Sequence, residues 1–168
     1  MSPPHQHHRA FALVEAIIAV VIVSVMMVAA LRTVGASRLG QAWSANQLRA
    51  LRLAQDLMAE IADKAYSDPD ETPLFGPEVS ELLPGRIAYD DIDDYNGLSE
   101  SPPQDRTGTA IPGLSGWQRS VSVAWVTAGN AATTSLTDTG IKRITVTVSK
   151  GNVPLARLVR LRTSAVAR

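Results

Sequence analysis

The chain contains 168 residues, of which 45% are hydrophobic, and its formal net charge at pH 7 is zero. This length suits one domain with a modest core. The absence of cysteine excludes a disulfide framework and a thiolate metal site, and no histidine follows residue 8. Because the commonest general base and the commonest activated thiol are missing from most of the chain, we predict a protein that is not an enzyme.

A polar leader, residues 1–10, precedes a strongly apolar segment. We expect the histidines of this leader to be disordered rather than to hold a metal ion. From Phe11 to Leu31 only Glu15 and Ser24 interrupt a run of Ala, Val, Ile, Leu, Met and Phe. A helix of this length spans roughly 30 Å, enough to cross the hydrocarbon core of a bilayer. The pattern therefore predicts a transmembrane helix over residues 11–31. The histidines concerned are His5, His7 and His8.

An amphipathic helix is predicted over residues 32–63. No proline occurs between Pro4 and Pro69, so this segment continues the apolar helix without a forced break. Its apolar residues recur at three-, four- and seven-residue steps, which predicts a stripe that packs on a globular part. The residues of this predicted stripe are Leu48, Leu51, Leu53, Leu57, Met58 and Ile61.

Residues 64–117 form a connecting region rich in Pro, Gly and Asp. Seven of the ten prolines lie there, which predicts turns and loops, with one short strand at Arg86–Tyr89. An acidic run within it offers clustered oxygen ligands of the kind that calcium prefers, but without the spacing of an EF-hand. We expect no cofactor; a solvated turn and a calcium site are the two interpretations of this run. The calcium candidates are Asp90, Asp91, Asp93 and Asp94.

Residues 118–168 are predicted to form an antiparallel sheet. Valines and isoleucines alternate with Ser and Thr over 121–125 and 144–148, and Gly151-Asn152 predicts a hairpin turn. A last strand is expected over 153–163, where Pro154 favours a sheet edge. Its predicted apolar face contains Val153, Leu155, Val159 and Leu161. The expected fold is therefore α+β: a long helix whose distal half covers a sheet of three or four strands.

The charges are segregated along the chain. Fourteen of the sixteen acids lie between Asp56 and Asp105, and nine of the sixteen Lys and Arg follow from Arg106 onward. This asymmetry predicts ion pairs within the fold or between neighbouring subunits. The basic end lacks interleaved aromatic residues, so we expect no nucleic acid partner.

Glu15 is a physical anomaly. A charged residue at the centre of a membrane helix costs about 2.5 to 3.5 kcal/mol, so such a residue usually has a partner and a role. No residue near it in sequence is a basic group that could lie in lipid with it.

The junction Arg9-Ala10-Phe11, followed by an apolar run with Glu15 inside it, resembles the type IV pilin and type II secretion pseudopilin family. Its precursors carry a short basic leader, a cleavage point before Phe and a Glu at the fifth mature position. The resemblance implies that prepilin peptidase cuts between Ala10 and Phe11 and methylates the new amino group of Phe11. It also implies that Glu15 faces that amine on a neighbouring subunit. The family usually has Gly where this chain has Ala10.

The resemblance further implies a structural subunit of a secretion pseudopilus or a type IV pilus-like fibre, rooted in the bacterial inner membrane. The expected partners are prepilin peptidase, other pilin or pseudopilin subunits, the inner-membrane assembly platform and membrane lipid. The LRLAQDLMAEI run over residues 51–61 is similar to minor pseudopilins of the I type or pilus proteins of the V type. The alternatives are an uncut signal anchor and a secretory signal cut after Val34-Gly35-Ala36, either of which predicts a periplasmic binding domain without fibre assembly.

Overall fold

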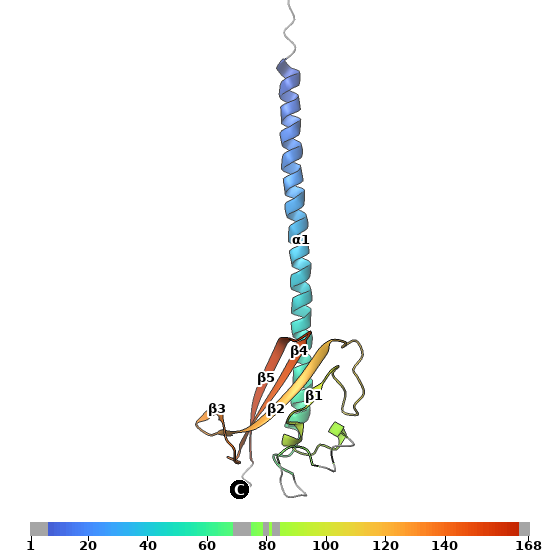
Figure 1. The fold of residues 1–168 in the computed structure, drawn as a ribbon. Coiled ribbons are helices and arrows are strands. Elements are labelled where there is room, and N and C mark those ends of the chain that lie inside the picture. The colour runs from blue at the N-terminus through green and yellow to red at the C-terminus, as the bar shows by residue number, and fades with distance from the viewer. Residues whose placement is uncertain (1–6, 69–74, 79–80, 82–84, 165–168) are drawn as a thin grey trace, which may run out of the picture. The chain divides into compact units, whose positions relative to one another are not determined.

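The computed structural model describes residues 7–68, 75–78, 81 and 85–164 (Figure 1). These residues form a long helix, α1, two 3₁₀ helices and five strands. The chain divides into two units, Met1–Ala45 and Asn46–Arg168. The described part of the first unit is helical throughout, and the second unit contains the last turns of α1 and the whole sheet.

Helix α1 extends from His7 to Ala62 and contains no proline, as the sequence predicts. Gly35 and Gly40 both lie inside it and are helical. Within the second unit, its buried side chains recur at steps of three and four residues, which places them on one face of the helix. These side chains belong to Ala50, Leu53, Ala54, Leu57, Met58 and Ile61. They form one hydrophobic core with the inward side chains of the sheet.

Two leucines of the predicted stripe lie outside this core. Leu48 is 69% exposed and Leu51 is 37% exposed. A helix turns by about 100° per residue, so Leu48 is rotated by about 200° from the buried Ala50 and Leu51 by about 100°. Met58 and Ile61, which continue the three- and seven-residue steps from Leu48 and Leu51, are buried with Leu53 and Leu57, so the core includes only part of the predicted stripe.

The strands form an antiparallel sheet in the order β1-β2-β4-β5, and β3 pairs with the end of β2. The long central strands are β2, Trp117–Thr127, and β4, Ile141–Lys150. Val121 lies opposite Val146 and Val123 opposite Ile144, so the alternating apolar residues of both strands meet on the face that α1 covers. The predicted alternation is confirmed here.

The turn Gly151-Asn152 joins β4 to β5, Val153–Thr163. Both turn residues have positive φ, 54° and 65°, which the twist of a two-residue hairpin requires. Among the described strands, β5 pairs with β4 alone and lies at the edge of the sheet, as Pro154 predicts.

The predicted apolar face of β5 is wrong in its second half. Val148 lies opposite Ala156 and Ser149 opposite Pro154, so a bulge leaves one extra residue in β5. One extra residue moves every following side chain to the other face of the sheet. Val159 and Leu161 therefore point away from α1 and are 55% and 48% exposed.

The connecting region contains more structure than the sequence predicts. It includes the 3₁₀ helices η1, Gly85–Ile87, and η2, Asp93–Tyr95, and the two-residue strand β1, Ser99–Glu100. The strand predicted at Arg86–Tyr89 is wrong, because a 3₁₀ turn there directs Arg86 into buried ion pairs. Together with β3, Asn130–Thr134, β1 raises the number of strands to five. Neither strand is long or apolar enough to give an alternation signal.

Candidate functional site

The first unit presents apolar side chains on every face of its helix. The large apolar residues between Leu13 and Val34 are half to two-thirds exposed. By length and composition α1 is able to cross a membrane, with a mean hydropathy of 2.7 in its most apolar stretch. A continuous apolar surface of this kind is unfavourable in water and marks a segment that lipid or other apolar helices cover.

The two hydroxyl side chains within this stretch are satisfied locally. The Ser24 hydroxyl donates to the Val20 carbonyl at 2.7 Å, and the Thr33 hydroxyl to the Ala29 carbonyl at 2.9 Å. Such bonds to the preceding turn let a hydroxyl lie in an apolar medium. Glu15 is the one charged residue between Leu13 and Leu31.

The residues predicted for processing and assembly lie at the start of this unit. Ala10 and Phe11 are part of α1, and their side chains lie outside the described part of the structure. The Glu15 side chain is exposed, and none of the ion pairs in the described part of the chain includes it. The roles of these residues in cleavage, methylation and assembly stay predictions.

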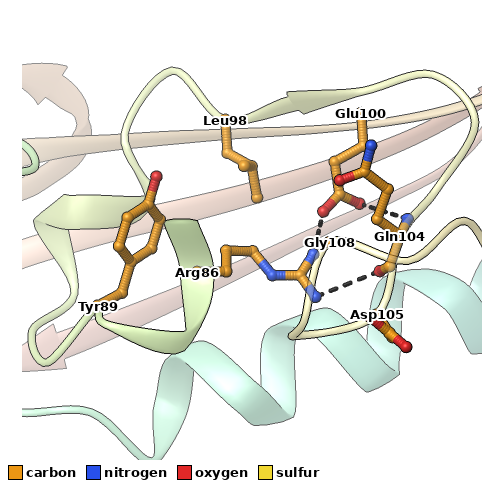
Figure 2. Close-up of a pocket in the computed structure, with 7 residues that line it drawn as sticks. All are labelled: Arg86, Tyr89, Leu98, Glu100, Gln104, Asp105 and Gly108. Atoms are coloured by element: carbon orange, nitrogen blue, oxygen red, sulfur yellow. Dashed lines mark hydrogen bonds and ion pairs between the residues drawn. The ribbon is translucent and has the colours of Figure 1, made fainter. Parts of the chain in front are cut away.

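A buried carboxylate, Glu100, organises the polar interior of the second unit. It is 4% exposed and pairs with the guanidinium group of Arg86 (Figure 2). It also pairs with the guanidinium group of Arg119. Arg119 donates through Nε and Nη2 to the same oxygen at 2.9 and 2.6 Å. Both guanidiniums also donate to the Gln104 carbonyl, at 3.2 and 2.6 Å. Glu100 therefore joins the connecting region to β2 by charge-assisted bonds.

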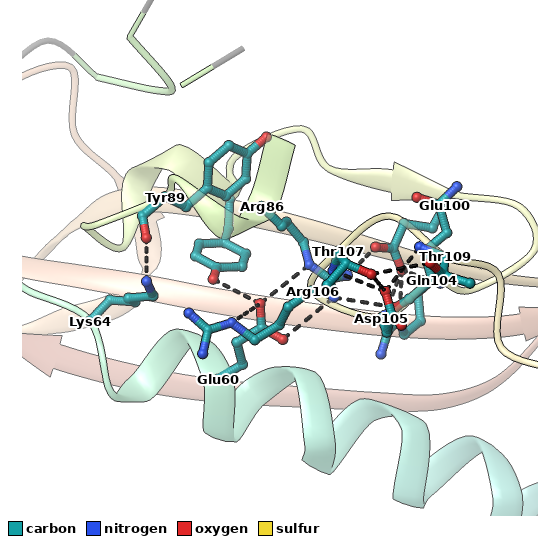
Figure 3. A network of polar contacts seen from close by, with 12 residues as sticks. Glu60, Lys64, Arg86, Tyr89, Glu100, Gln104, Asp105, Arg106, Thr107 and Thr109 are labelled. Carbon is teal, nitrogen blue, oxygen red and sulfur yellow. Dashed lines mark hydrogen bonds and ion pairs between the residues drawn. The ribbon is translucent and has the colours of Figure 1, made fainter. Parts of the chain in front are cut away.

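Glu60 extends this network to helix α1 (Figure 3). Its carboxylate lies 3.2 Å from Arg86 Nε and 3.9 Å from Arg106 Nε, and it accepts a hydrogen bond from the Tyr95 hydroxyl at 3.0 Å. Burial and the Glu60 charge raise the pKa of Tyr95, so the phenol stays protonated and remains a donor. Two carboxylates and three guanidiniums thus connect the helix, the connecting region and the sheet.

A cavity of about 150 Å³ lies beside this network. Its lining includes the polar groups of Arg86 and Glu100 and the side chains of Tyr89 and Leu98 (Figure 2). The Glu100 carboxylate of this lining is bound to guanidiniums, and the Asp105 carboxylate accepts hydrogen bonds from Thr107 and Thr109, so neither is placed as a free general base. The chemistry of this arrangement is structural: it holds the connecting region on the core.

A second buried ion pair involves Lys142, which is 2% exposed in the middle of the sheet. Its ammonium group pairs with Asp93, donates to the Tyr66 carbonyl and lies 4.5 Å from the centre of the Tyr66 ring. Lys142 thereby links β4 to the turn η2 and to Tyr66, which follows the end of α1.

The four calcium candidates lie in and just before this same turn, and each of them interacts with other groups of the chain. Asp91 Oδ1 accepts the backbone N–H of Asp93 at 2.7 Å, and Asp94 Oδ2 accepts the N–H groups of Asp90 and Asp91 at 3.0 and 2.9 Å. Asp93 pairs with Lys142. These carboxylates therefore act as turn acceptors. Calcium binding is an open prediction.

A different set of three carboxylates lies close together in space. Ligand oxygens of Glu78, Glu81 and Asp94 lie within 4.8 Å of one another. Burial and a hydrogen bond with Glu78 raise the pKa of Glu81 to about 8, and burial raises that of Asp94. Burial and the neighbouring Asp93 charge raise the pKa of Asp91 to about 7. Protons shared among these acids are one way in which so many carboxyl groups remain close together.

Sequence reasoning missed the buried charges of the sheet, although a signal for them exists. Arg119 lies in the same alternating phase as Trp117 and Val121, and Lys142 lies in phase with Ile144. A charged residue in the buried phase of a strand needs a buried counter-charge. The partners belong to the acidic connecting region, so part of the charge asymmetry is satisfied within the fold.

Comparison with known proteins identifies the N-terminal segment. Residues 5–31 match the family model for the prokaryotic N-terminal methylation motif. No curated protein matches the chain. No solved structure matches it either.

The match covers residues 5–10 of the leader, the cleavage junction and the apolar run, which belong to the prepilin-type signal of type IV pilins and pseudopilins. The N-terminal segment is therefore a prepilin-type signal, and such a signal implies processing by prepilin peptidase and assembly with other pilin subunits. Proteins of this type are structural subunits rather than enzymes. The apolar part of α1 fits a transmembrane anchor.

Proposed function

We propose that this chain is a minor subunit of a type II secretion pseudopilus or a type IV pilus-like fibre. Prepilin peptidase cuts between Ala10 and Phe11 and methylates the new amino group of Phe11. The processed subunits then associate through the apolar part of α1, and Glu15 of one subunit pairs with the amino group of Phe11 on its neighbour.

The observation that carries this proposal is the single carboxylate of the apolar segment. Glu15 lies in a stretch where Ser24 and Thr33 are satisfied by their own helix, and no cation of the described residues pairs with it. Four residues of helix rise by about 6 Å, so a neighbouring helix shifted by that amount brings its Phe11 amine level with Glu15. The pairing supplies a counter-charge within the lipid, where an unpaired carboxylate is costly.

The proposed location follows from the same segment. The protein is a single-pass protein of the bacterial inner membrane, and its second unit lies in the periplasm or in the extracytoplasmic fibre. Its partners there are the inner-membrane assembly platform, membrane lipid and other subunits. A nucleic acid partner is not part of this proposal, because the basic residues of β2 and β4 bind carboxylates or carbonyls of the fold.

The mature N-terminus tests processing. Mass spectrometry of the protein from its native cell is expected to find a chain that begins with N-methylated Phe11. A chain that begins at Ser37 would identify an ordinary secretory signal, and a retained leader would identify a signal anchor. Either result would replace the fibre proposal by the alternative of a periplasmic binding domain.

Assembly is tested by Glu15→Ala, with Ser24→Ala as the matched control within the same apolar segment. Shearing fractionation and immunoblotting measure how much of each variant enters the fibre and how much stays in the membrane. We expect Glu15→Ala to be exported and processed but absent from the fibre, and Ser24→Ala to behave as the parent protein. Equal incorporation of both variants would contradict the proposed charge pairing.

A further inference from the structure

Strand β5 is a long open edge of the sheet. Ten of its eleven residues pair with β4 on one side, and no described segment pairs with its other side. The opposite edge strand, β1, contains only two residues. An edge strand presents unpaired N–H and C=O groups that another chain can bind, so a strand of this length requires either protection or a partner.

Proline residues and bulges usually protect an edge strand from pairing with another chain, and in β5 they occur only at its beginning. Pro154 and the bulge beside Ser149 interrupt its first residues. From Ala156 to Thr163 the strand contains no proline and no acid. This segment, residues 156–163, is called the β5 edge below. Its outward apolar side chains, Val159 and Leu161, are about half exposed.

The charges of the β5 edge are not neutralised by the described part of the fold. Arg157 and Arg160 are exposed, and no described carboxylate lies within ion-pair distance of either. Among the described residues, Arg162 donates only to the Ala62 carbonyl, at 3.5 Å. Arg106, Arg119 and Lys142, in contrast, all reach carboxylates. Part of the basic excess that the sequence predicts is therefore found at this edge.

These arginines discriminate between occupants of the edge. An antiparallel pair of two β5 strands centred on Arg160 places the Arg160 side chains of the two copies opposite each other. Centred on Leu161, the pair opposes Arg160 of one copy to Arg162 of the other. Like charges directly opposite each other are destabilising in a sheet, whereas opposite charges are favourable. These two registers are therefore unfavourable for a second β5, although the register centred on Val159 opposes no two arginines, whereas an acidic strand places carboxylates opposite the arginines.

We propose that the β5 edge binds an extended acidic segment of another protein by strand addition. Backbone hydrogen bonds lengthen the sheet by one strand, as in other β-augmentation complexes. Arg157 and Arg160 are three residues apart and lie on opposite faces of the sheet. The partner segment therefore carries two acidic residues separated by two others, with an apolar residue opposite Val159. This inference does not depend on fibre assembly.

The test uses the full-length protein in detergent micelles and a short fluorescein-labelled peptide of Val and Thr that carries two glutamates in this spacing. Fluorescence anisotropy measures its affinity. We expect the double variant Arg157→Gln/Arg160→Gln to bind at least about tenfold more weakly, which corresponds to about 1.4 kcal/mol. The matched control is Arg38→Gln/Arg52→Gln, which removes the same charge from exposed positions of α1 and is expected to leave the affinity unchanged.

Strand addition is distinguished from simple charge attraction by two further peptides, N-methylated on one or the other set of alternate residues. One set faces β5 and the other faces solvent, so only one of these peptides is expected to lose binding. Hydrogen exchange of the amides of the β5 edge is expected to slow when the unmodified peptide binds. The proposal would be overturned if both methylated peptides bound equally or if the parent peptide did not bind. It would also be overturned if the Arg157→Gln/Arg160→Gln variant had an unchanged affinity. Protection of the same amides with rising protein concentration alone would overturn it in favour of a second copy as the occupant.

Discussion

Substitution of Glu100 by Gln tests the buried ion network most directly. The Glu100 carboxylate is 4% exposed and accepts hydrogen bonds from Arg86 and Arg119 and from the Gln104 backbone N–H. Gln keeps the size and one acceptor oxygen but leaves two buried guanidiniums without this counter-charge. Breaking a buried ion pair by removing one partner costs about 3–5 kcal/mol, because the remaining charge is desolvated and uncompensated. We expect the free energy of unfolding of the second unit to fall by about that amount.

Urea denaturation of the full-length protein in detergent micelles measures this change. Trp117 is 2% exposed and Trp125 contacts Phe75, so tryptophan fluorescence reports on the packing of the second unit. With a slope of about 1–3 kcal/mol per molar urea, the midpoint is expected to decrease by about 1–5 M, or the variant unfolds without urea.

The matched control is Arg106→Gln. The Arg106 side chain is 55% exposed and lies 3.9 Å from Glu60, so the loss of this pair is expected to cost at most about 1 kcal/mol. If Glu100→Gln and Arg106→Gln lower the urea midpoint equally, the network does not hold the connecting region on the core, and the reasoning from burial is refuted.

Three further predictions concern the core stripe and the acidic turn. Leu57→Ala should lower the free energy of unfolding by about 2–5 kcal/mol, whereas Leu48→Ala should change it by less than about 0.5 kcal/mol, and equal urea midpoints would contradict the observed orientation of α1. Asp91 and Glu81 have folded-state pKa values of about 7 and about 8, above their ordinary values of 3.8 and 4.5, so each binds more protons folded than unfolded. Their contribution to stability is complete below about pH 4 and is lost as the pH rises through about 7 to 8. The urea midpoint of the parent protein should therefore decrease between about pH 4 and pH 8, and Asp91→Asn should make this decrease smaller. Because the calcium candidates within residues 90–94 largely accept protein hydrogen bonds, the melting temperature should agree within about 2 °C in calcium and in EGTA, and a larger shift would establish a bound cation.

Local patterns were sufficient for the regular elements. The unbroken helix, the alternation of β2 and β4 and the Gly151-Asn152 turn each depend on residues close together in the chain. The anomaly of Glu15 is also local, because a carboxylate inside an apolar run is unusual whatever the rest of the chain does. For the same reason, the prepilin-type signal is readable without any tertiary structure.

The remaining features depend on which distant residues come together. The placement of the sheet decides which residues of the apolar stripe on α1 are buried. One bulge in β5 decides whether Val159 points inward. Lys142 is separated along the chain from its partner Tyr66 by 76 residues. Glu100 is separated from its partner Gln104 by 4 residues.

Sequence alone therefore determined the long apolar helix, the three long strands and the processing signal of this protein, since hydrophobic periodicity and turn conformation act over a few residues. Only the tertiary structure decided which charges are buried together and which, at the β5 edge, are left for another molecule. The physical reason is that a charge is neutralised by whatever lies within a few ångströms of it in space, and the alternation along one strand carries no record of that neighbour.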